Sequence, residues 1–248
     1  MQFKTSISKI DTDDIIIRDN KLSNLIANYS FTDGIFLLLS GRFPETAESK
    51  IFSAMLTSII DHGMGTTSAL TTRFVTSGGN SLNAAVGAGI LAQGDFHGGA
   101  IETSMKQISQ FTTTFKTEED LEKIIKEYIE YKKTIFGYGH KVYKQGDPRV
   151  KMILNICDEL GYKSEFVDTA LKIESLIEKI KGSRLVLNID GLIAALLLTM
   201  GFKPNIGKGI FIIGRVPGLV AHSIEEKENE KPVRRLEEDQ ITYNPKNT

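Results

Sequence analysis

The chain has very little cysteine, almost no net charge and no long apolar run. Cys157 is the only cysteine among 248 residues, so no internal disulfide can form, which is typical of a reducing compartment. The formal net charge of −1 gives no reason to expect nucleic acid or an anionic membrane as a partner. The longest apolar run, LIAALLLTMGF, is far shorter than the ~20 residues that a membrane-spanning helix needs. We therefore expect a cytoplasmic protein, in which any positive charge that binds an acidic substrate is local.

The N-terminal sequence MQFKTSISKIDTDD also lacks the apolar segment of a signal peptide, so we expect no secretory signal. A length of 248 residues suits one large domain or two small ones. Cys157 falls on the apolar face of a predicted helix, which favours a buried structural thiol.

Hydrophobic periodicity predicts a mostly helical protein with a short β-hairpin near the start. Residues 3–18 alternate polar and apolar side chains, and DDIIIRDNKL suggests a hairpin with its turn near Asn20. Apolar residues then recur at helical spacing in five segments, several of which close on a glycine. These segments are residues 48–63, 118–133, 150–161, 168–182 and 191–201. The last of them is apolar on every side, so it should be a buried helix, whereas the charged residues 225–248 resemble a solvated tail.

Two of the four histidines lie in glycine-rich loops, His97 in GDFHGGA and His140 in GYGHKVY. Glycine is used where the backbone turns tightly or approaches something closely, and we expect here that it lets the backbone and imidazole approach a bound substrate. A third histidine, His62, follows the first long helix in the sequence DHG. Taken singly, each histidine is more often a packing or capping residue than a catalytic one.

Asp190 and several arginines complete the set of candidate acid–base and binding residues. Asp190 stands in NIDGLIAAL, where contact with an apolar helix would raise its pKa and suit it to act as a base, although an aspartate there is more often an N-cap. Arginine offers a rigid fork of donors for carboxylates, but it is also a common surface charge. The arginines concerned are Arg149, Arg215, Arg234 and Arg235.

Taken together and in order, these motifs resemble the citrate synthase superfamily from SFTDGIFLLLSGRFP to the C-terminus. The matching segments are DHG, GDFHGGA, GYGHKVYKQGDPR and NIDGLI. The resemblance implies an all-α, two-domain fold in which a small domain, residues 103–202, closes over the substrate. Residues 1–102 and 203–248 would form the large domain.

The family forms or breaks the bond between the acetyl methyl of acetyl-CoA and the keto carbon of oxaloacetate. By resemblance, Asp190 is the base at the methyl group, and His97 hydrogen-bonds the thioester oxygen. His140 polarises the oxaloacetate carbonyl, or accepts the hydroxyl proton when citryl-CoA is cleaved. The same resemblance assigns carboxylate binding to His62, Arg149, Arg215 and Arg235. In a homodimer Arg235 would reach into the partner subunit's site, with Arg234 as the alternative.

The sequence gives no reason to expect a bound metal or a permanent cofactor. Three histidines and an aspartate could ligate zinc, but no pair has the short His-x₂₋₄-His spacing typical of such sites. A CoA thioester is expected as substrate, with the loop of Lys141 and Lys144 as a candidate neighbour of its phosphates.

Within the family, the wording GDFHGGAIE, LNIDGLI and EEDQITY is most similar to citryl-CoA lyases, including the C-terminal module of ATP-citrate lyase. The sequence lacks the long helical N-terminal region of ordinary citrate synthases, and it has no phosphate-binding loop, so we expect that it does not phosphorylate citrate itself. A separate citryl-CoA synthetase is a candidate partner, and the sequence leaves its existence open. His97 is retained as in synthases, whereas the lyase module often replaces it. A citrate synthase or 2-methylcitrate synthase therefore stays an alternative, as does a non-catalytic subunit or scaffold. The segment GAGILAQGDFHGG lacks the preceding strand that a dinucleotide-binding fingerprint requires.

Overall fold

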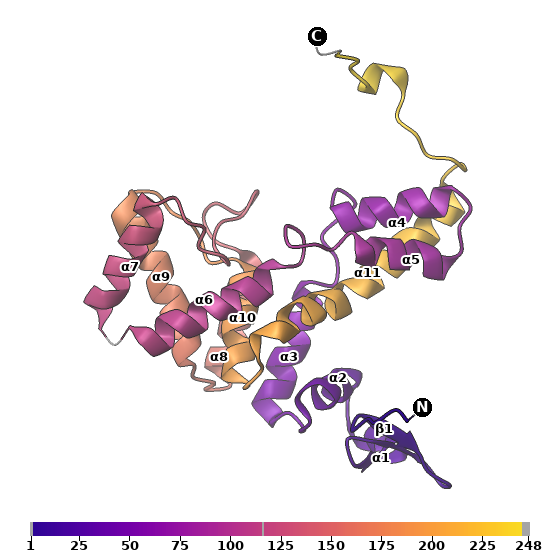
Figure 1. The fold of residues 1–248 in the computed structure, drawn as a ribbon, viewed down its shortest axis with the longest axis horizontal. Coiled ribbons are helices and arrows are strands. Elements are labelled where there is room, and N and C mark those ends of the chain that lie inside the picture. Colours follow the sequence, from indigo (N-terminus) through magenta and orange to yellow (C-terminus); the bar gives the residue numbers. More distant parts are fainter. Residues whose placement is uncertain (1, 116, 245–248) are drawn as a thin grey trace. The chain divides into compact units, whose positions relative to one another are not determined.

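The computed structural model describes residues 2–115 and 117–244, and these residues are mostly helical, as predicted (Figure 1). Met1 and Lys116, which fall in the expected large and small domains, and residues 245–248 of the expected tail lie outside the described residues. The strands are β1 (Ser8–Ile10), β2 (Ile15–Ile17) and β3 (Asn20–Lys21). The helices are α1 (Leu22–Asn28), α2 (Phe31–Ser40), α3 (Thr46–Ser58), α4 (Thr67–Ser77), α5 (Leu82–Leu91), α6 (Ala100–Thr114), α7 (Glu118–Glu130), α8 (Pro148–Glu159), α9 (Glu165–Lys181), α10 (Ile189–Thr199) and α11 (Gly207–Asn229), with short 3₁₀ turns at Pro204–Ile206 and Glu238–Gln240.

The N-terminal strands form an antiparallel sheet in the order β1-β2-β3, which confirms the expected hairpin and adds a strand to it. The hairpin turn lies at Arg18 and Asp19, one position before the expected Asn20. Both residues have positive φ, 46° and 63°, which is the backbone conformation that a tight two-residue hairpin turn requires. The Arg18 side chain holds this conformation by donating to the carbonyl oxygen of Leu38 from Nε and Nη2.

The chain divides into two compact units. The first comprises residues 1–59 and 98–213, and the second comprises residues 60–97 and 214–248. The expected small domain, residues 103–202, lies wholly within the first unit, and its closure over substrate stays a prediction.

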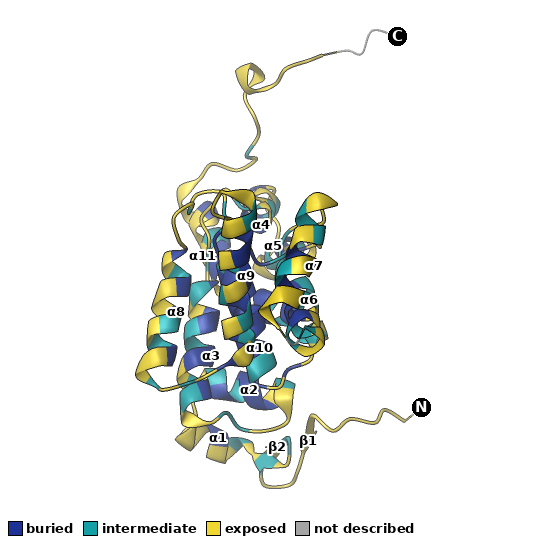
Figure 2. Cartoon of the chain, turned by 90° about the vertical axis from the view of Figure 1, so that its left-hand side faces the viewer, coloured by how far each residue is buried: buried dark blue, intermediate teal, exposed yellow. Residues whose placement is uncertain are grey.

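Helix α10 is the centre of the first unit, where it packs against α6, α8 and α9 (Figure 1). Residues 192–197 are fully buried, which confirms the expected all-apolar buried helix. Figure 2 shows the neighbouring helices as amphipathic, with exposed residues along one side and buried residues along the other. Cys157 is buried on the inner face of α8, as expected for a structural thiol.

Two helix boundaries differ from the predicted ones. α3 ends at Ser58 rather than at Gly63, because residues 61–63 form a separate turn in which the Gly63 N–H donates to the Asp61 carboxylate. α11 continues through residues 225–229, which were expected to begin the tail. The reason is that Glu226 points into the second unit and pairs there with Arg73 and Arg234.

The second unit contains α4, α5 and the C-terminal part of α11. α4 and α5 pack closely because Gly89 has no side chain: a Cβ there would lie 2.0 Å from Thr72 Oγ1 and 3.0 Å from the Ser68 carbonyl oxygen. Across both units, no helix in residues 2–115 and 117–244 combines the length and hydrophobicity needed to span a bilayer.

Candidate active site

The candidate residues are divided between the two units, and each group is described separately. The first unit holds His140, Arg149 and Asp190, and the second holds His62, His97, Arg215 and Arg235.

In the first unit a short backbone pairing joins the His140 loop to the segment before α10. The Gly139 N–H donates to the Val186 carbonyl oxygen at 2.6 Å, and the Asn188 N–H donates to the Gly137 carbonyl oxygen at 2.9 Å. The Asn188 side chain adds a third bond, from Nδ2 to the Gly139 carbonyl oxygen at 2.9 Å. His140 therefore follows directly on backbone that is fixed to the start of the Asp190 helix.

Glycines allow this close approach, but the atoms they approach belong to the protein. A Cβ on Gly137, where φ is +87°, would lie 2.6 Å from Gly191 Cα, and one on Gly139 would lie 2.8 Å from Leu185 Cδ1. In the His97 loop a Cβ on Gly98 would lie 2.6 Å from the Phe211 ring. These glycines thus let the loops pack against neighbouring segments, and their expected role in the approach to a bound substrate stays a prediction.

His140 is held as a neutral imidazole with its proton on Nε2. The backbone N–H groups of Val142 and Tyr143 both donate to Nδ1, each at 3.1 Å, so Nδ1 is an acceptor. Burial, and then the positive charge of Arg149, lower the pKa of His140 below its ordinary value. The Tyr143 ring stacks on the imidazole with centroids 4.5 Å apart. The group is suited to donating a hydrogen bond from Nε2.

Asp147 connects Arg149 to the Asp190 helix, although the sequence analysis did not single it out. Its buried carboxylate accepts from Arg149 Nε at 2.9 Å and Nη2 at 2.7 Å, and from the Ile189 N–H at 3.3 Å. Burial alone would raise the pKa of Asp147, but bonding to Arg149 outweighs it and holds the pKa below the ordinary value. Its position before Pro148, the first residue of α8, was the available sequence signal, because this pattern is typical of a helix N-cap.

Asp190 lies half-buried in the first turn of α10. The N-cap of this helix is Asn188, whose Oδ1 accepts from the N–H groups of Asp190 at 3.0 Å and Gly191 at 3.2 Å. The N-cap role that competed with a catalytic role for Asp190 is therefore filled by Asn188. A carboxylate in the first helical turn is stabilised by the helix dipole.

In the second unit His97, His62 and Arg215 influence one another electrostatically. Burial, and then the charges of Arg215 and His62, lower the pKa of His97, so its imidazole is neutral at neutral pH. His97 Nε2 lies 2.9 Å from Ser68 Oγ, a partner that no local sequence pattern indicated. Arg215 is buried in α11, whereas His62 is exposed in the turn after α3.

The two C-terminal arginines have different environments. Arg234 donates to Glu226 from Nε at 2.7 Å and Nη2 at 2.9 Å, and its backbone N–H donates to Ser77 Oγ. Arg235 is exposed. Arg234 is thus engaged within its own chain, and the expectation that Arg235 reaches a partner subunit stays a prediction.

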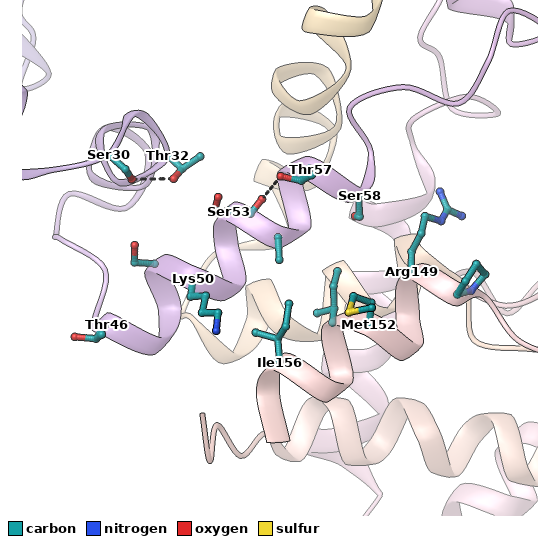
Figure 3. Close-up of a pocket in the computed structure, with 14 residues that line it drawn as sticks. Ser30, Thr32, Thr46, Lys50, Ser53, Thr57, Ser58, Arg149, Met152 and Ile156 are labelled. Carbon is teal, nitrogen blue, oxygen red and sulfur yellow. Dashed lines mark hydrogen bonds between the residues drawn. The ribbon is translucent and has the colours of Figure 1, made fainter. Parts of the chain in front are cut away.

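A groove of about 780 Å³ lies between α3 and α8 in the first unit (Figure 3). Figure 3 shows Arg149 at one end of the groove and Thr46 at the other, with Met152 and Ile156 along the α8 side. The described residues that line it include no histidine and no acid. Elsewhere in residues 2–115 and 117–244, no group of three or more His, Cys, Asp or Glu side chains could hold a metal ion.

Comparison with known proteins gives one family. The family model described as citrate synthase, C-terminal domain, matches residues 44–236. Citrate synthase 2 of Bacillus subtilis (strain 168) is 28% identical over 211 residues, which are 84% of this chain and 55% of the relative. The chain thus spans about half the length of the curated relatives it matches.

Two solved structures cover almost all of this chain. A citryl-CoA lyase from Hydrogenobacter thermophilus is 45% identical with a TM-score of 0.93, and the match covers 99% of this chain and 96% of that one. An ATP citrate lyase from Methanothrix soehngenii, in complex with citrate and coenzyme A, has a TM-score of 0.88 at 22% identity and shares the fold. That match covers 100% of this chain and 42% of that one. The fold and the family expected from the sequence motifs are both confirmed, and the chain belongs to the citrate synthase family.

Proposed function

We propose that the protein is a citryl-CoA lyase, which cleaves citryl-CoA into acetyl-CoA and oxaloacetate. The observation that carries this proposal is the paired backbone of residues 137–139 and 186–188, which fixes a neutral imidazole donor, His140, beside the helix that bears Asp190. The similarity to a citryl-CoA lyase over nearly the full length of both chains supports the same activity.

The tautomer of His140 refines how the proton moves. The sequence suggested that His140 accepts the hydroxyl proton of citryl-CoA, but Nε2 already carries a proton while Nδ1 accepts from the backbone. We therefore assign His140 as the donor that holds the oxygen, and Asp190 as the base. Asp190 takes the hydroxyl proton as the carbonyl forms and the carbon–carbon bond breaks, and then returns it to the carbon of the acetyl enolate. No further acid or base is needed, and the reverse sequence of steps gives the condensation.

His97 would stabilise the enolate oxygen of acetyl-CoA during this step. Its neutral imidazole can donate a hydrogen bond to the developing negative charge, and Ser68 at 2.9 Å restrains the ring. One preorganised donor of this kind contributes about 3–4 kcal/mol to transition-state stabilisation.

The carboxylates of the oxaloacetate portion would be bound by His62, Arg149, Arg215 and, across a homodimer, Arg235. Asp147 occupies Nε and Nη2 of Arg149 and so fixes the plane of the guanidinium, which orients Nη1. A fixed guanidinium loses less entropy when it binds a carboxylate.

Two lysines near His140 are candidates to bind the CoA portion of the substrate. Lys144 donates from Nζ to the His140 carbonyl oxygen at 2.7 Å, so this lysine stays beside the site and can meet the CoA phosphates, as can the exposed Lys141. Citryl-CoA would come from a separate synthetase, and the reaction would take place in the cytoplasm without a permanent cofactor or a metal.

A citrate synthase or 2-methylcitrate synthase is the second candidate. His97 favours it, because synthases keep a histidine at this loop position, and curated relatives include a citrate/2-methylcitrate synthase of Bacillus subtilis (strain 168), 30% identical over 211 residues. The two candidates differ in one step, since a synthase also hydrolyses the thioester of citryl-CoA.

The first experiment supplies citryl-CoA to the purified protein and follows oxaloacetate and free CoA separately. A lyase gives oxaloacetate and acetyl-CoA with no free thiol, whereas a synthase gives citrate and free CoA. Asp190→Asn should abolish cleavage of the carbon–carbon bond while leaving substrate binding nearly intact. Asp168→Asn changes an exposed aspartate in the first turn of α9 and serves as the matched control. If neither product forms, the protein is a non-catalytic family member and the proposal is wrong.

A further inference from the structure

His222 lies between a buried arginine and the turn that carries His62, all within the second unit. On one side, Arg73 Nη1 is 3.3 Å from His222 Nδ1. On the other side, His222 Nε2 is 3.1 Å from Asp61 Oδ1. The three side chains come from α4, α11 and the turn after α3.

This arrangement fixes the tautomer of His222. A guanidinium has donors and no acceptor, so Nδ1 of His222 must accept from Arg73. The ring proton is then on Nε2, where it is donated to the Asp61 carboxylate. His222 is thus oriented in one direction only, with Arg73 as its donor and Asp61 as its acceptor.

Asp61 in turn shapes the backbone on both sides of His62. Its Oδ2 accepts from the Gly63 N–H at 2.8 Å, which closes the turn over His62. α11 approaches this turn so closely that a Cβ on Gly218 would lie 2.5 Å from the Ile60 carbonyl oxygen and 2.9 Å from Asp61 Oδ1. The turn is therefore fitted against the helix that bears His222.

Arg73 is a rigid starting point for this chain of bonds. It is only 4% exposed, and its Nε donates to the equally buried Glu226 at 2.6 Å. Glu225 accepts from Nη1, and Glu226 also binds Arg234. A buried charge that is paired on several sides would lose those bonds if it moved. Arg73 therefore has one favourable orientation.

We propose that His222 is a positioning residue for substrate binding, which transmits the fixed orientation of Arg73 to Asp61 and so holds the turn that presents His62. The inference rests on the proposed function in one respect, the role of His62 as a ligand of the carboxylated substrate. It assigns a role to a histidine that the sequence motifs left unused.

Two conservative variants distinguish the hydrogen bond at Nε2 of His222 from the one at Nδ1. In His222→Gln, the amide nitrogen can take the place of Nε2 and keep the bond to Asp61. In His222→Asn, the amide oxygen can take the place of Nδ1 and keep the bond to Arg73, while the bond to Asp61 is lost. We expect His222→Asn to raise the Kd of oxaloacetate and the KM of citryl-CoA about tenfold with little change in kcat, and His222→Gln to stay within about twofold of the parent protein.

Calorimetry, steady-state kinetics and thermal melting of both variants test this expectation. A larger KM and Kd in His222→Asn than in His222→Gln, at equal melting temperature, supports positioning through Asp61. Equal losses in both variants, or no loss in either, would overturn it.

Histidine-ring ¹H–¹⁵N spectra give a readout that needs no activity, since the chain has only four histidines. They should show the proton of His222 on Nε2, and the His62 signals should shift in His222→Asn but not in His222→Gln. A proton on Nδ1, or His62 signals that do not respond, would refute the inference even if the protein proves to be a lyase. Conversely, if citryl-CoA is not cleaved but the His62 signals respond as expected, the proposed function fails and the positioning role stands.

Discussion

Asp147→Asn should destabilise the protein more than Arg149→Ala, although Arg149 is the proposed substrate ligand. Asp147 is 2% exposed, and its carboxylate accepts from Arg149 and from the first N–H of α10. An asparagine keeps the shape, but its amide NH₂ faces a donor and its lost charge leaves the guanidinium unpaired. Breaking a buried ion pair from one side costs about 3–5 kcal/mol.

Arg149→Ala should cost less, because the Asp147 carboxylate keeps the backbone N–H groups of Arg149 and Ile189 as donors. We expect about 1.5–3 kcal/mol for this loss of charge-assisted bonds. For a protein of this size, each kcal/mol lowers the melting temperature by roughly 2–4 °C, so Asp147→Asn should melt about 6–20 °C below the parent. Substrate binding should show the opposite order, with the greater loss in Arg149→Ala.

Urea unfolding and thermal melting rank the two variants by stability, and the Kd of oxaloacetate ranks them by substrate binding. The dependence of stability on acid pH gives a further check. In the folded protein the pKa of Asp147 lies below its ordinary 3.8, so the ionised carboxylate contributes its full stabilisation to the fold above that value. This contribution is lost as pH falls through the folded pKa. Asp147→Asn should lack that part of the acid dependence, and the exposed Asp168→Asn should retain it. If Asp147→Asn proves no less stable than Arg149→Ala, the role of Asp147 as the link to α10 is refuted.

Four other predictions follow from single contacts. Since the pKa of His140 is lowered, kcat/KM for citryl-CoA should be level near neutral pH and fall on the acid side with an apparent pKa below 6.5, as a pH–rate profile would show. Gly137→Ala should prevent normal folding, measured by circular dichroism and soluble yield, because its Cβ would lie 2.6 Å from Gly191 Cα. Arg235→Ala should weaken oxaloacetate binding at unchanged melting temperature, whereas Arg234→Ala should lower the melting temperature, because only Arg234 pairs with Glu226. Cys157 should resist a thiol reagent until the protein unfolds, since burial raises its pKa to about 11.

The sequence predicted those parts of the fold in which local pattern and packing agree. The apolar stripe of α7, the glycine after α9 and the uniformly apolar α10 each appear where they were expected. The loops of His97 and His140 could be recognised in the sequence because they are local features with their own glycines, whereas their roles in a site stay predictions. The prediction erred at two boundaries. A local bond from the Gly63 N–H to the Asp61 carboxylate ends α3 early, whereas the distant pairing of Arg73 with Glu226 extends α11 into the expected tail.

The residues that the sequence missed act through partners far along the chain. Asp147 binds the Ile189 N–H across 42 positions, and His222 binds Asp61 across 161. Neither pairing leaves a local pattern, because each is made by tertiary packing. The glycine loops show the same limit: the need for glycine was evident from the sequence, but the close approach of Gly137 to Gly191 was not.

Asp61 and Asp147 have equivalent positions in the two units. Each carboxylate stands directly or almost directly before a proposed substrate ligand, His62 or Arg149, and each also binds a donor on a helix that packs beside it. Pairing with Asp147 cancels much of the charge that Arg149 would otherwise project, and the whole chain is nearly neutral. Under the proposed function, recognition of the acidic substrate would therefore depend on donors held in fixed directions rather than on long-range attraction. The carboxylates that fix those donors would then matter as much as the ligands themselves.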